Sequence, residues 1–404
     1  MVGAAGPIQS PMEILSQLAR QDTSGSAGDA RRTGAPSVTL AVLTYNGRDL
    51  LDATLPSVLA QRSDGELRVL VVDDGSSDGT VEHLGRRWPE VQVLALGENV
   101  GVTAALNRAV STAKTDFVAL LNNDVELAAD WLPRLMDALE AHPEAGTACG
   151  KLLRYHEPDR IDAAGDVLLR SGAGINRGAG ELDRGQYDRA EEVFGASAAA
   201  ALYRRSAFDV VGDFDESFSA YLEDVDWSMR AQLAGFSARY EPAAVGYHMG
   251  SATTQRDSSR FVALSRRNQL LLIAKTFPAA MLMRHSWRIA IHLMLVLAGS
   301  ACDGNLGQTL RMWAAAVRML PGAVRRRRLV RATRTVAPRD VEAVMAAGLP
   351  RTLSAAGRLA FELAPCSGQL RLAAVTACAH ETSRSSAPPD DNVAVLRKDL
   401  RPAA

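Results

Sequence analysis

Apolar runs alternate with segments of helical character from residue 37 to residue 121, and this alternation restricts the fold more than any other feature. Strands that alternate with helices form a mainly parallel sheet with helices on both faces, so we predict an α/β fold. Ligands of such sheets bind at the carboxyl ends of the strands, where the sequence places Tyr45, Asp73, Asp74 and Asp124. The expected strands are 38–43, 67–72, 91–96 and 117–121, and the expected helices are 49–61, 80–88 and 102–113.

The remainder of the chain divides by composition. Gly and Arg are frequent in 150–195, which we interpret as loops and short strands, and two later strands are expected at 195–203 and 239–248. A short helix at 11–20 is the one element expected near the N-terminus. The predicted units are a flexible leader (1–36), an α/β catalytic domain (37–255), a basic helical segment (256–335), and a helical extension with a disordered tail (336–404).

Charge is unevenly distributed. The formal net charge is -1 over 404 residues, which gives the whole protein no attraction to nucleic acid. Residues 256–334 nevertheless carry 15 Lys or Arg and only two acids, Asp257 and Asp303. This asymmetry indicates that the segment faces an anionic partner.

An apolar run lies inside this basic segment. Its 14 uncharged residues, 289–302, are fewer than the roughly 20 that a membrane-spanning helix needs. The arrangement suits a helix that lies in the surface of an anionic membrane. The alternative is a packed helical subdomain with a solvated basic face. The flanking cations are Arg284, Arg288, Arg311, Arg318, Arg325, Arg326, Arg327 and Arg328.

The four cysteines do not form a metal-binding or redox pattern. Cys149, Cys302, Cys366 and Cys378 contain no CxxC pair and no zinc-type spacing with histidine. Free thiols and a cytoplasmic location are therefore expected. The N-terminus also shows no basic region followed by an apolar core, so no secretory signal is predicted.

The stretch 221–227, YLEDVDW, places three carboxylates within four positions, directly before a helical run. One interpretation is a charged helix start, because acidic residues are stabilised at the N-terminus of a helix. The other is a general base, with a second carboxylate that holds it in place.

Three acidic positions follow one another: Asp73 with Asp74, Asp124, and Glu223 with Asp224. A nucleotide diphosphate substrate needs an acceptor for its base and ribose, a carboxylate that holds a divalent cation, and a base for the attacking hydroxyl. Hard cations such as Mg²⁺ or Mn²⁺ prefer carboxylate oxygen. Taken singly, each motif also fits an ordinary turn or polar loop, and His248 fits a hydrogen-bonded residue at a strand end.

Together these motifs resemble those of family 2 glycosyltransferases, which have the GT-A fold, and the rhamnosyltransferase-like branch in particular. The resemblance covers roughly residues 37–250. The resemblance rests on the motifs TYN at 44–46, VDDGS at 72–76, ENVG at 98–101, LNND at 121–124, GDFDE at 212–216 and YLEDVD at 221–226, and on Pro242 and His248.

The resemblance implies a metal-dependent, inverting transfer from a nucleotide-sugar. Asp224 matches the catalytic base with Glu223 beside it, while Asp124 and His248 match the groups at the Mg²⁺ or Mn²⁺ ion. The sequence departs from the family at Asn122, where an acid is usual, which leaves fewer charged metal ligands. The residues that match the nucleotide-binding positions are Thr44, Tyr45, Asn46, Asp73, Asp74, Asn99 and Asn123.

By the same resemblance, the expected donor is dTDP-rhamnose and the expected acceptor a saccharide or polyprenyl-linked saccharide of the cell envelope. The enzyme would act peripherally at the inner face of the plasma membrane. The alternatives are transfer of galactofuranose or mannose by the same fold, and a non-catalytic nucleotide-binding or membrane scaffold protein.

Overall fold

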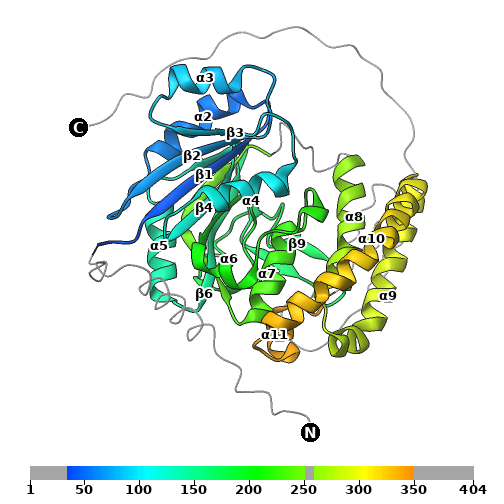
Figure 1. The fold of residues 1–404 in the computed structure, drawn as a ribbon. Coiled ribbons are helices and arrows are strands. Elements are labelled where there is room, and N and C mark those ends of the chain that lie inside the picture. The colour runs from blue at the N-terminus through cyan, green and yellow to red at the C-terminus, as the bar shows by residue number, and fades with distance from the viewer. Residues whose placement is uncertain (1–33, 251–258, 349–404) are drawn as a thin grey trace. The chain divides into compact units, whose positions relative to one another are not determined.

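The computed structural model describes residues 34–250 and 259–348. The expected helix at 11–20 and the tail after residue 348 lie outside these residues. Within them, a ten-stranded sheet is flanked by helices, and the chain continues into a group of helices (Figure 1).

The first half of the sheet is parallel, as predicted. Its strands run in the order β3-β2-β1-β4, and Val38 of β1 lies opposite Leu67 of β2 and Phe117 of β4. The strands are β1 (Val38–Thr44), β2 (Leu67–Asp73), β3 (Gln92–Ala95) and β4 (Phe117–Asn122), and the helices between them are α2 (Arg48–Leu59), α3 (Thr80–Arg87) and α4 (Val102–Thr112).

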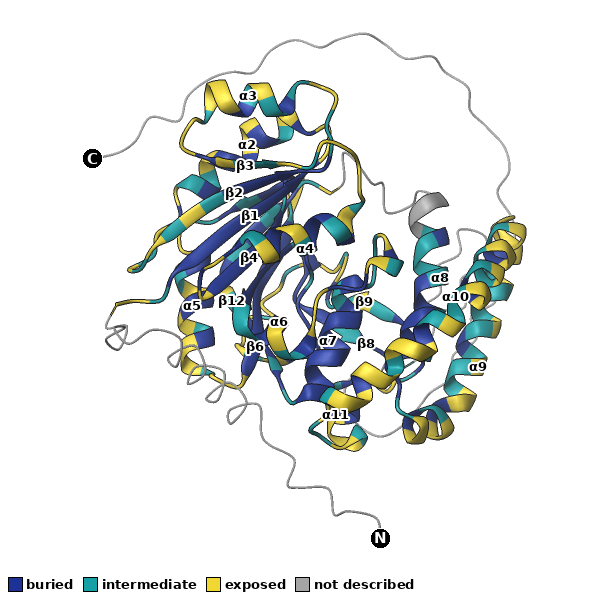
Figure 2. Cartoon of the chain, viewed as in Figure 1, coloured by how far each residue is buried: buried dark blue, intermediate teal, exposed yellow. Residues whose placement is uncertain are grey.

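Strands β1 and β4 and the second half of β2 are buried on both faces, which explains their almost continuous apolar runs (Figure 2). Successive side chains of a strand point to opposite faces. Leu40 and Val42 accordingly belong to one hydrophobic cluster, and Ala41 and Leu43 belong to another on the opposite face.

The second half of the sheet is mixed. β11 (Ala200–Arg204) runs antiparallel between β4 and β6 (Ala145–Arg154), β12 (Ser237–His248) pairs parallel with β6, and β10 (Glu191–Val193) closes the edge. The sequence analysis predicted no element for residues 125–149, which contain the helix α5 (Trp131–Ala141) and the first half of the buried ten-residue strand β6. Short strands do occur in 150–195, as expected, but the buried end of β6 at 150–154 was not distinguished from them. Smaller strands are β5 (Val125–Leu127), β7 (Glu157–Ala163), β8 (Asp166–Leu168) and β9 (Gly174–Asn176).

The later helices pack on one another through a third cluster. Phe218, Met229, Leu271, Phe277 and Ala316 are buried in it, so the basic segment shares a core with the helix that carries the acidic stretch. In the described part of the chain, no helix is long and apolar enough to cross a membrane. The elements are α6 (Arg205–Val211), η2 (Glu216–Phe218), α7 (Glu223–Ala234), α8 (Ser259–Thr276), α9 (Ala279–Cys302), α10 (Leu306–Thr333) and α11 (Pro338–Val344).

Candidate active site

The carboxyl end of β2 carries two buried aspartates with different surroundings. Asp73 accepts a hydrogen bond from the Ser76 backbone N–H at 3.0 Å, and its Oδ1 has no partner among the described residues. Asp74 instead accepts the backbone N–H groups of Val100 (2.7 Å) and Gly101 (3.1 Å). Asp73 therefore offers an acceptor to a ligand, whereas Asp74 holds the loop that precedes α4.

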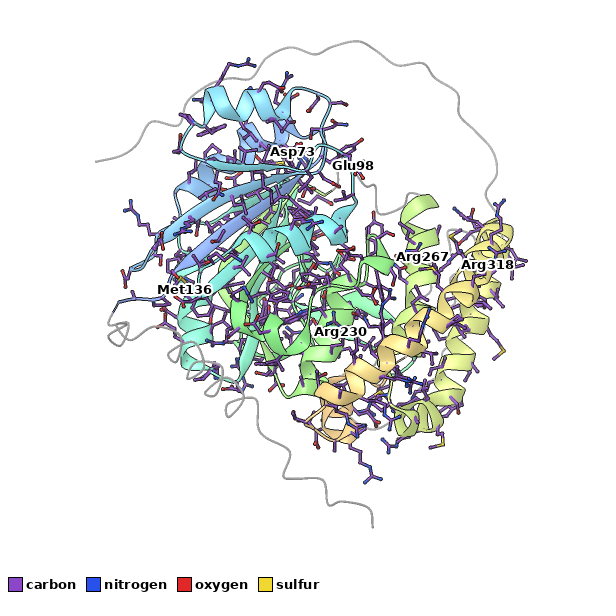
Figure 3. All side chains as sticks on the ribbon, in the orientation of Figure 1. Asp73, Glu98, Met136, Arg230, Arg267 and Arg318 are labelled. Atoms are coloured by element: carbon purple, nitrogen blue, oxygen red, sulfur yellow. The ribbon has the colours of Figure 1, made fainter. Side chains whose placement is uncertain are left out.

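This loop lies directly against the VDDGS turn. Gly75 has a φ of +74°, and a Cβ there would come within 2.3 Å of the Glu98 backbone. Only glycine tolerates both the left-handed conformation and this contact. The close packing explains why the motifs around Asp73 and Glu98 occur together, and Figure 3 shows both side chains at the same end of the sheet.

Two more predicted nucleotide-binding residues hold the backbone in place. The Asn123 amide donates to Thr44 Oγ1 at 2.9 Å, and both residues are buried. A Cβ on Gly47 would lie 2.1 Å from the Asn123 side chain, so a larger residue there would displace this hydrogen-bonded pair. Thr44 and Asn123 thus join the carboxyl ends of β1 and β4.

Three further predicted nucleotide-binding residues lie in the exposed loops after β1 and β3. Tyr45 is 41% exposed, and Asn99 is exposed as well. Asn46 has a φ of 47° and accepts the Ser77 backbone N–H through its side chain at 2.8 Å. Tyr45 and Asn99 leave their side chains available beside Asp73, whereas Asn46 ties its loop to the turn after β2.

Asp124 and His248 meet, although they are far apart in the sequence. His248 ends β12, and its Nε2 lies 3.2 Å from Asp124 Oδ1. Its Nδ1 lies 2.8 Å from Asp162 Oδ2 in β7. Burial opposes the charged imidazole, but the two carboxylates dominate and raise the pKa of His248 to about 9. A second carboxylate behind a histidine is the usual way to orient a metal-binding imidazole.

Glu223 and Asp224 begin α7. Asp224 accepts the Ala198 backbone N–H at 3.1 Å and the Val225 N–H at 2.8 Å. Glu223 is buried, and its Oε2 has no partner among the described residues. Burial raises the pKa of both carboxyls, and the charge of Asp224 raises that of Glu223 further. Three backbone hydrogen bonds oppose this rise at Asp224 and only one opposes it at Glu223, which favours Asp224 as the ionised member of the pair.

Backbone contacts bring these groups together at one edge of the sheet. The Thr103 N–H donates to the Ser219 carbonyl at 3.2 Å, which joins the loop before α4 to the loop before α7. Ala198 binds Asp224, and the carbonyl of the adjacent Ala199 accepts the Asn122 N–H at 2.9 Å. The nucleotide, metal and base positions predicted from sequence therefore lie on connected loops.

Sequence reasoning missed Asp162, which orients His248, and Asn268, which binds the loop before Glu223. Asp162 lies in a short stretch with no recognisable motif. Asn268 lies 44 positions after Asp224 in a helix interpreted only by its charge. Among the described residues, no group of three or more His, Cys, Asp or Glu is arranged as a complete metal site.

The mixed sheet with its surrounding helices and the helical region after it has the GT-A architecture. The family model described as "Glycosyl transferase family 2" matches residues 39–212. The chain therefore contains a domain of this family, and it is a glycosyltransferase.

Relatives support the assignment. The chain is 28% identical over 284 residues to an N-acetylglucosaminyl-diphospho-decaprenol L-rhamnosyltransferase of Mycobacterium tuberculosis. The aligned region covers 63% of this chain and 92% of the relative. It is 29% identical to a pre-mycofactocin glycosyltransferase of the same species, over 58% of this chain and 48% of the relative. The solved structure of GalNAc-T7 with UDP, GalNAc and Mn²⁺ shares the fold, with a TM-score of 0.53, 13% identity, and coverage of 74% and 63% of the two chains.

Proposed function

We propose that this glycosyltransferase inverts the anomeric centre and transfers rhamnose from dTDP-rhamnose to a saccharide hydroxyl on a polyprenyl-linked acceptor. The supporting observation is the Asp224 carboxylate, which accepts two backbone N–H groups and lies on loops connected to Asp73 and Asp124. The choice of donor and lipid acceptor rests on the likeness to the mycobacterial rhamnosyltransferase.

In the proposed reaction, Asp224 takes the proton of the acceptor hydroxyl. The acceptor oxygen forms a bond to the anomeric carbon from the face opposite the leaving group, and the bond from that carbon to the phosphate oxygen breaks. The nucleoside diphosphate leaves with the bonding electrons. Asp73 accepts a hydrogen bond from the nucleoside through its unpaired Oδ1.

Asp124 and His248 suit a divalent cation such as Mg²⁺ or Mn²⁺. Their donor atoms converge, and Asp162 fixes the imidazole from behind. Mg²⁺ is commonly held by one or two protein ligands, with water and substrate phosphates in the other positions, so the absence of an acid at Asn122 is compatible with binding. When bound, the cation supplies charge neutralisation at the departing diphosphate.

A donor screen with an activity assay tests the proposal. Thermal shifts with dTDP-rhamnose, UDP-galactofuranose and GDP-mannose, each with Mn²⁺ or Mg²⁺, identify the donor because a ligand of the native state raises apparent stability. Transfer is then measured on N-acetylglucosaminyl-diphospho-polyprenol. If only another nucleotide-sugar stabilises the protein, its sugar replaces rhamnose as the proposed donor sugar. If a donor binds but is neither hydrolysed nor used for transfer, the result favours a non-catalytic scaffold protein.

Asp124→Ala is expected to weaken dTDP binding in Mn²⁺ but not in EDTA, since a metal-bridging carboxylate is lost. Isothermal titration calorimetry with and without chelator measures both affinities. Asp159→Ala, an exposed aspartate on the same β7 strand as Asp162, is the control. Equal affinity with and without chelator in the wild-type protein would remove the metal from the proposal.

The helices α9 and α10 support peripheral attachment at the inner face of the membrane. Figure 2 shows exposed positions along both helices, and large apolar side chains are among them. They are Met283 (74%), Trp287 (53%) and Met294 (60%) on α9, and Leu310 (50%), Val317 (58%), Val324 (53%) and Leu329 (69%) on α10.

The sequence-based expectation that Arg325, Arg326, Arg327 and Arg328 all face an anionic surface requires a correction. Arg326 donates to Ser217 Oγ at 3.1 Å and lies 3.3 Å from Asp215. Arg327 donates to the carbonyl of Ala274 in α8 at 2.8 Å and to that of Phe277 just after this helix. These two arginines bind the protein itself, so we take Arg325 and Arg328, which are exposed and have no such bond among the described residues, as the candidates for lipid contact.

Arg325→Ser/Arg328→Ser is expected to weaken binding to anionic vesicles by about 2 kcal/mol at low salt, since each basic residue near such a surface contributes about 1 kcal/mol. Co-sedimentation with phosphatidylglycerol vesicles at low and high salt measures the effect. Arg86→Ser/Arg87→Ser removes the same charge from α3 and is the control. No binding by the wild-type protein at low salt, or an equal loss in the control, would contradict membrane attachment.

A further inference from the structure

The loop before the acidic stretch has an unfavourable backbone. Ser219, Tyr221 and Leu222 have φ values of 63°, 68° and 67°, although none is glycine. Left-handed conformations of such residues cost about 1–3 kcal/mol each and persist only where the surroundings enforce them. The surroundings that enforce this conformation come from α8.

Asn268 of α8 lies inside the loop. It is fully buried, and its Nδ2 lies 2.9 Å from the Phe218 carbonyl oxygen and 2.8 Å from those of Ala220 and Tyr221. Its Oδ1 accepts the Nε–H of Arg267 at 2.9 Å. Arg267, labelled in Figure 3, donates to the same Phe218 carbonyl at 2.7 Å.

The position of this loop connects Asn268 to the chemistry. Tyr221 is three residues before Asp224, and the Leu222 carbonyl accepts the Asp226 N–H at 2.9 Å in the first turn of α7. At its other end, the Ser219 carbonyl accepts the Thr103 N–H at the start of α4. The loop therefore lies between the nucleotide-binding loop and the base, and its backbone sets the direction of the Asp224 side chain.

We infer that Asn268 is a positioning residue for sugar transfer: it holds residues 218–222 in the backbone conformation that directs Asp224 toward the acceptor. The inference rests on the proposed role of Asp224 as the base. It makes the helix α8 part of the catalytic unit, and it gives the basic helical segment a role in the reaction itself besides any contact with lipid.

The test compares two adjacent buried amides of α8. Asn268→Leu keeps the approximate volume and removes the donor. Gln269→Leu is the matched control, because the Gln269 side chain is buried and its Nε2 has no hydrogen-bond partner among the described residues. Asp224→Asn and the double variant Asp224→Asn/Asn268→Leu are prepared in parallel. For each, kcat, the donor KM, the dTDP affinity and the folded fraction at the assay temperature are measured.

Asn268→Leu is expected to lower kcat about 10²-fold, the scale of a displacement of about 1 Å at a reacting group. The donor KM and the dTDP affinity should stay within about two-fold, because the nucleotide residues are on other elements, and Gln269→Leu should behave like the wild type. The double variant should lose little more than Asp224→Asn alone, since residues that act as a unit are not additive.

The outcomes separate this inference from the proposed function. If Asp224→Asn lowers kcat and Asn268→Leu does not, Asn268 is not a positioning residue and the base assignment stands. If Asp224→Asn itself retains transfer, the base assignment fails. If the decreases in kcat multiply in the double variant, or if kcat of Asn268→Leu falls only in proportion to its folded fraction, Asn268 has only a stabilising role. Either result would overturn the inference. Should Asn268→Leu fail to fold, Asn268→Ser, which keeps one donor, must show an intermediate kcat.

Discussion

Replacing Asp224 by Asn is expected to lower the rate of sugar transfer by roughly 10²–10⁴-fold, the usual contribution of a general base. The amide has nearly the same size but cannot accept the acceptor's proton. Donor binding should stay close to that of the wild-type protein, because Asp73 and the Asp124–His248 pair lie on other loops. Single-turnover transfer and dTDP calorimetry on the same preparation separate the two effects.

The pH profile gives a second readout of Asp224. Burial raises the pKa of Asp224 above that of a free aspartate. Since the base acts only when ionised, the rate of the wild-type enzyme should fall as the pH drops through this raised pKa, and Asp224→Asn should lose this acid limb. Asp213→Asn, an exposed aspartate shortly before the acidic stretch, is the control. A turnover of Asp224→Asn within a few-fold of the wild type would refute the base assignment.

The second large effect is expected at Lys275 of α8, and it concerns stability. Lys275 Nζ lies 2.8 Å from both Asp215 Oδ2 and Asp226 Oδ2, and all three side chains are buried. Asp226 also accepts the Arg230 Nε–H at 2.9 Å. Removing one member of a buried ion cluster costs about 3–5 kcal/mol, because a charge is left without its partner.

Lys275→Met is therefore expected to lower the free energy of unfolding by about 3 kcal/mol, at the low end of that range, because Arg230 still pairs with Asp226. Urea denaturation measures the change. Lys114→Met on the surface should change stability little, and a double-mutant cycle with Asp215→Asn should show a coupling energy of about 0.5–3 kcal/mol. Equal stability of Lys275→Met and Lys114→Met would show that the cluster does not support the fold.

The direction in which pH changes the stability contributed by Asp215 follows from its pKa. Burial opposes ionisation of Asp215, but the charge of Lys275 and its hydrogen bonds outweigh it and lower the pKa of Asp215 in the folded state. The stabilisation from this group is thus present above the pKa of an unfolded aspartate and is lost as the pH falls through the lowered folded value. Lys275→Met should reduce this acid sensitivity.

The sequence alone determined the first half of the fold, because the physical signal there is local. Strands β1 and β4 and the second half of β2 are buried on both faces and give almost continuous apolar runs, while α2, α3 and α4 lie between the strands and have helical periodicity. The residues at the strand ends, including Asp73, Asp74 and Asp124, follow from that alternation, because the carboxyl ends of parallel strands share one edge of the sheet.

Only the tertiary structure decided which of these residues bind the protein's own backbone and which keep an atom available for a ligand. Asp73 and Asp74 are adjacent in sequence, yet one keeps an unpaired oxygen while the other binds two backbone amides of a loop that follows β3. His248 acquires its second carboxylate from Asp162, 86 positions earlier, and the loop before Asp224 is held by Asn268, 47 positions after Tyr221. Such contacts depend on where the strands and helices cross in space, and no local periodicity encodes them. The same reason applies to the arginines of α10: the sequence determines their charge, and contacts with Asp215, Ser217 and α8 decide which of them bind the protein itself.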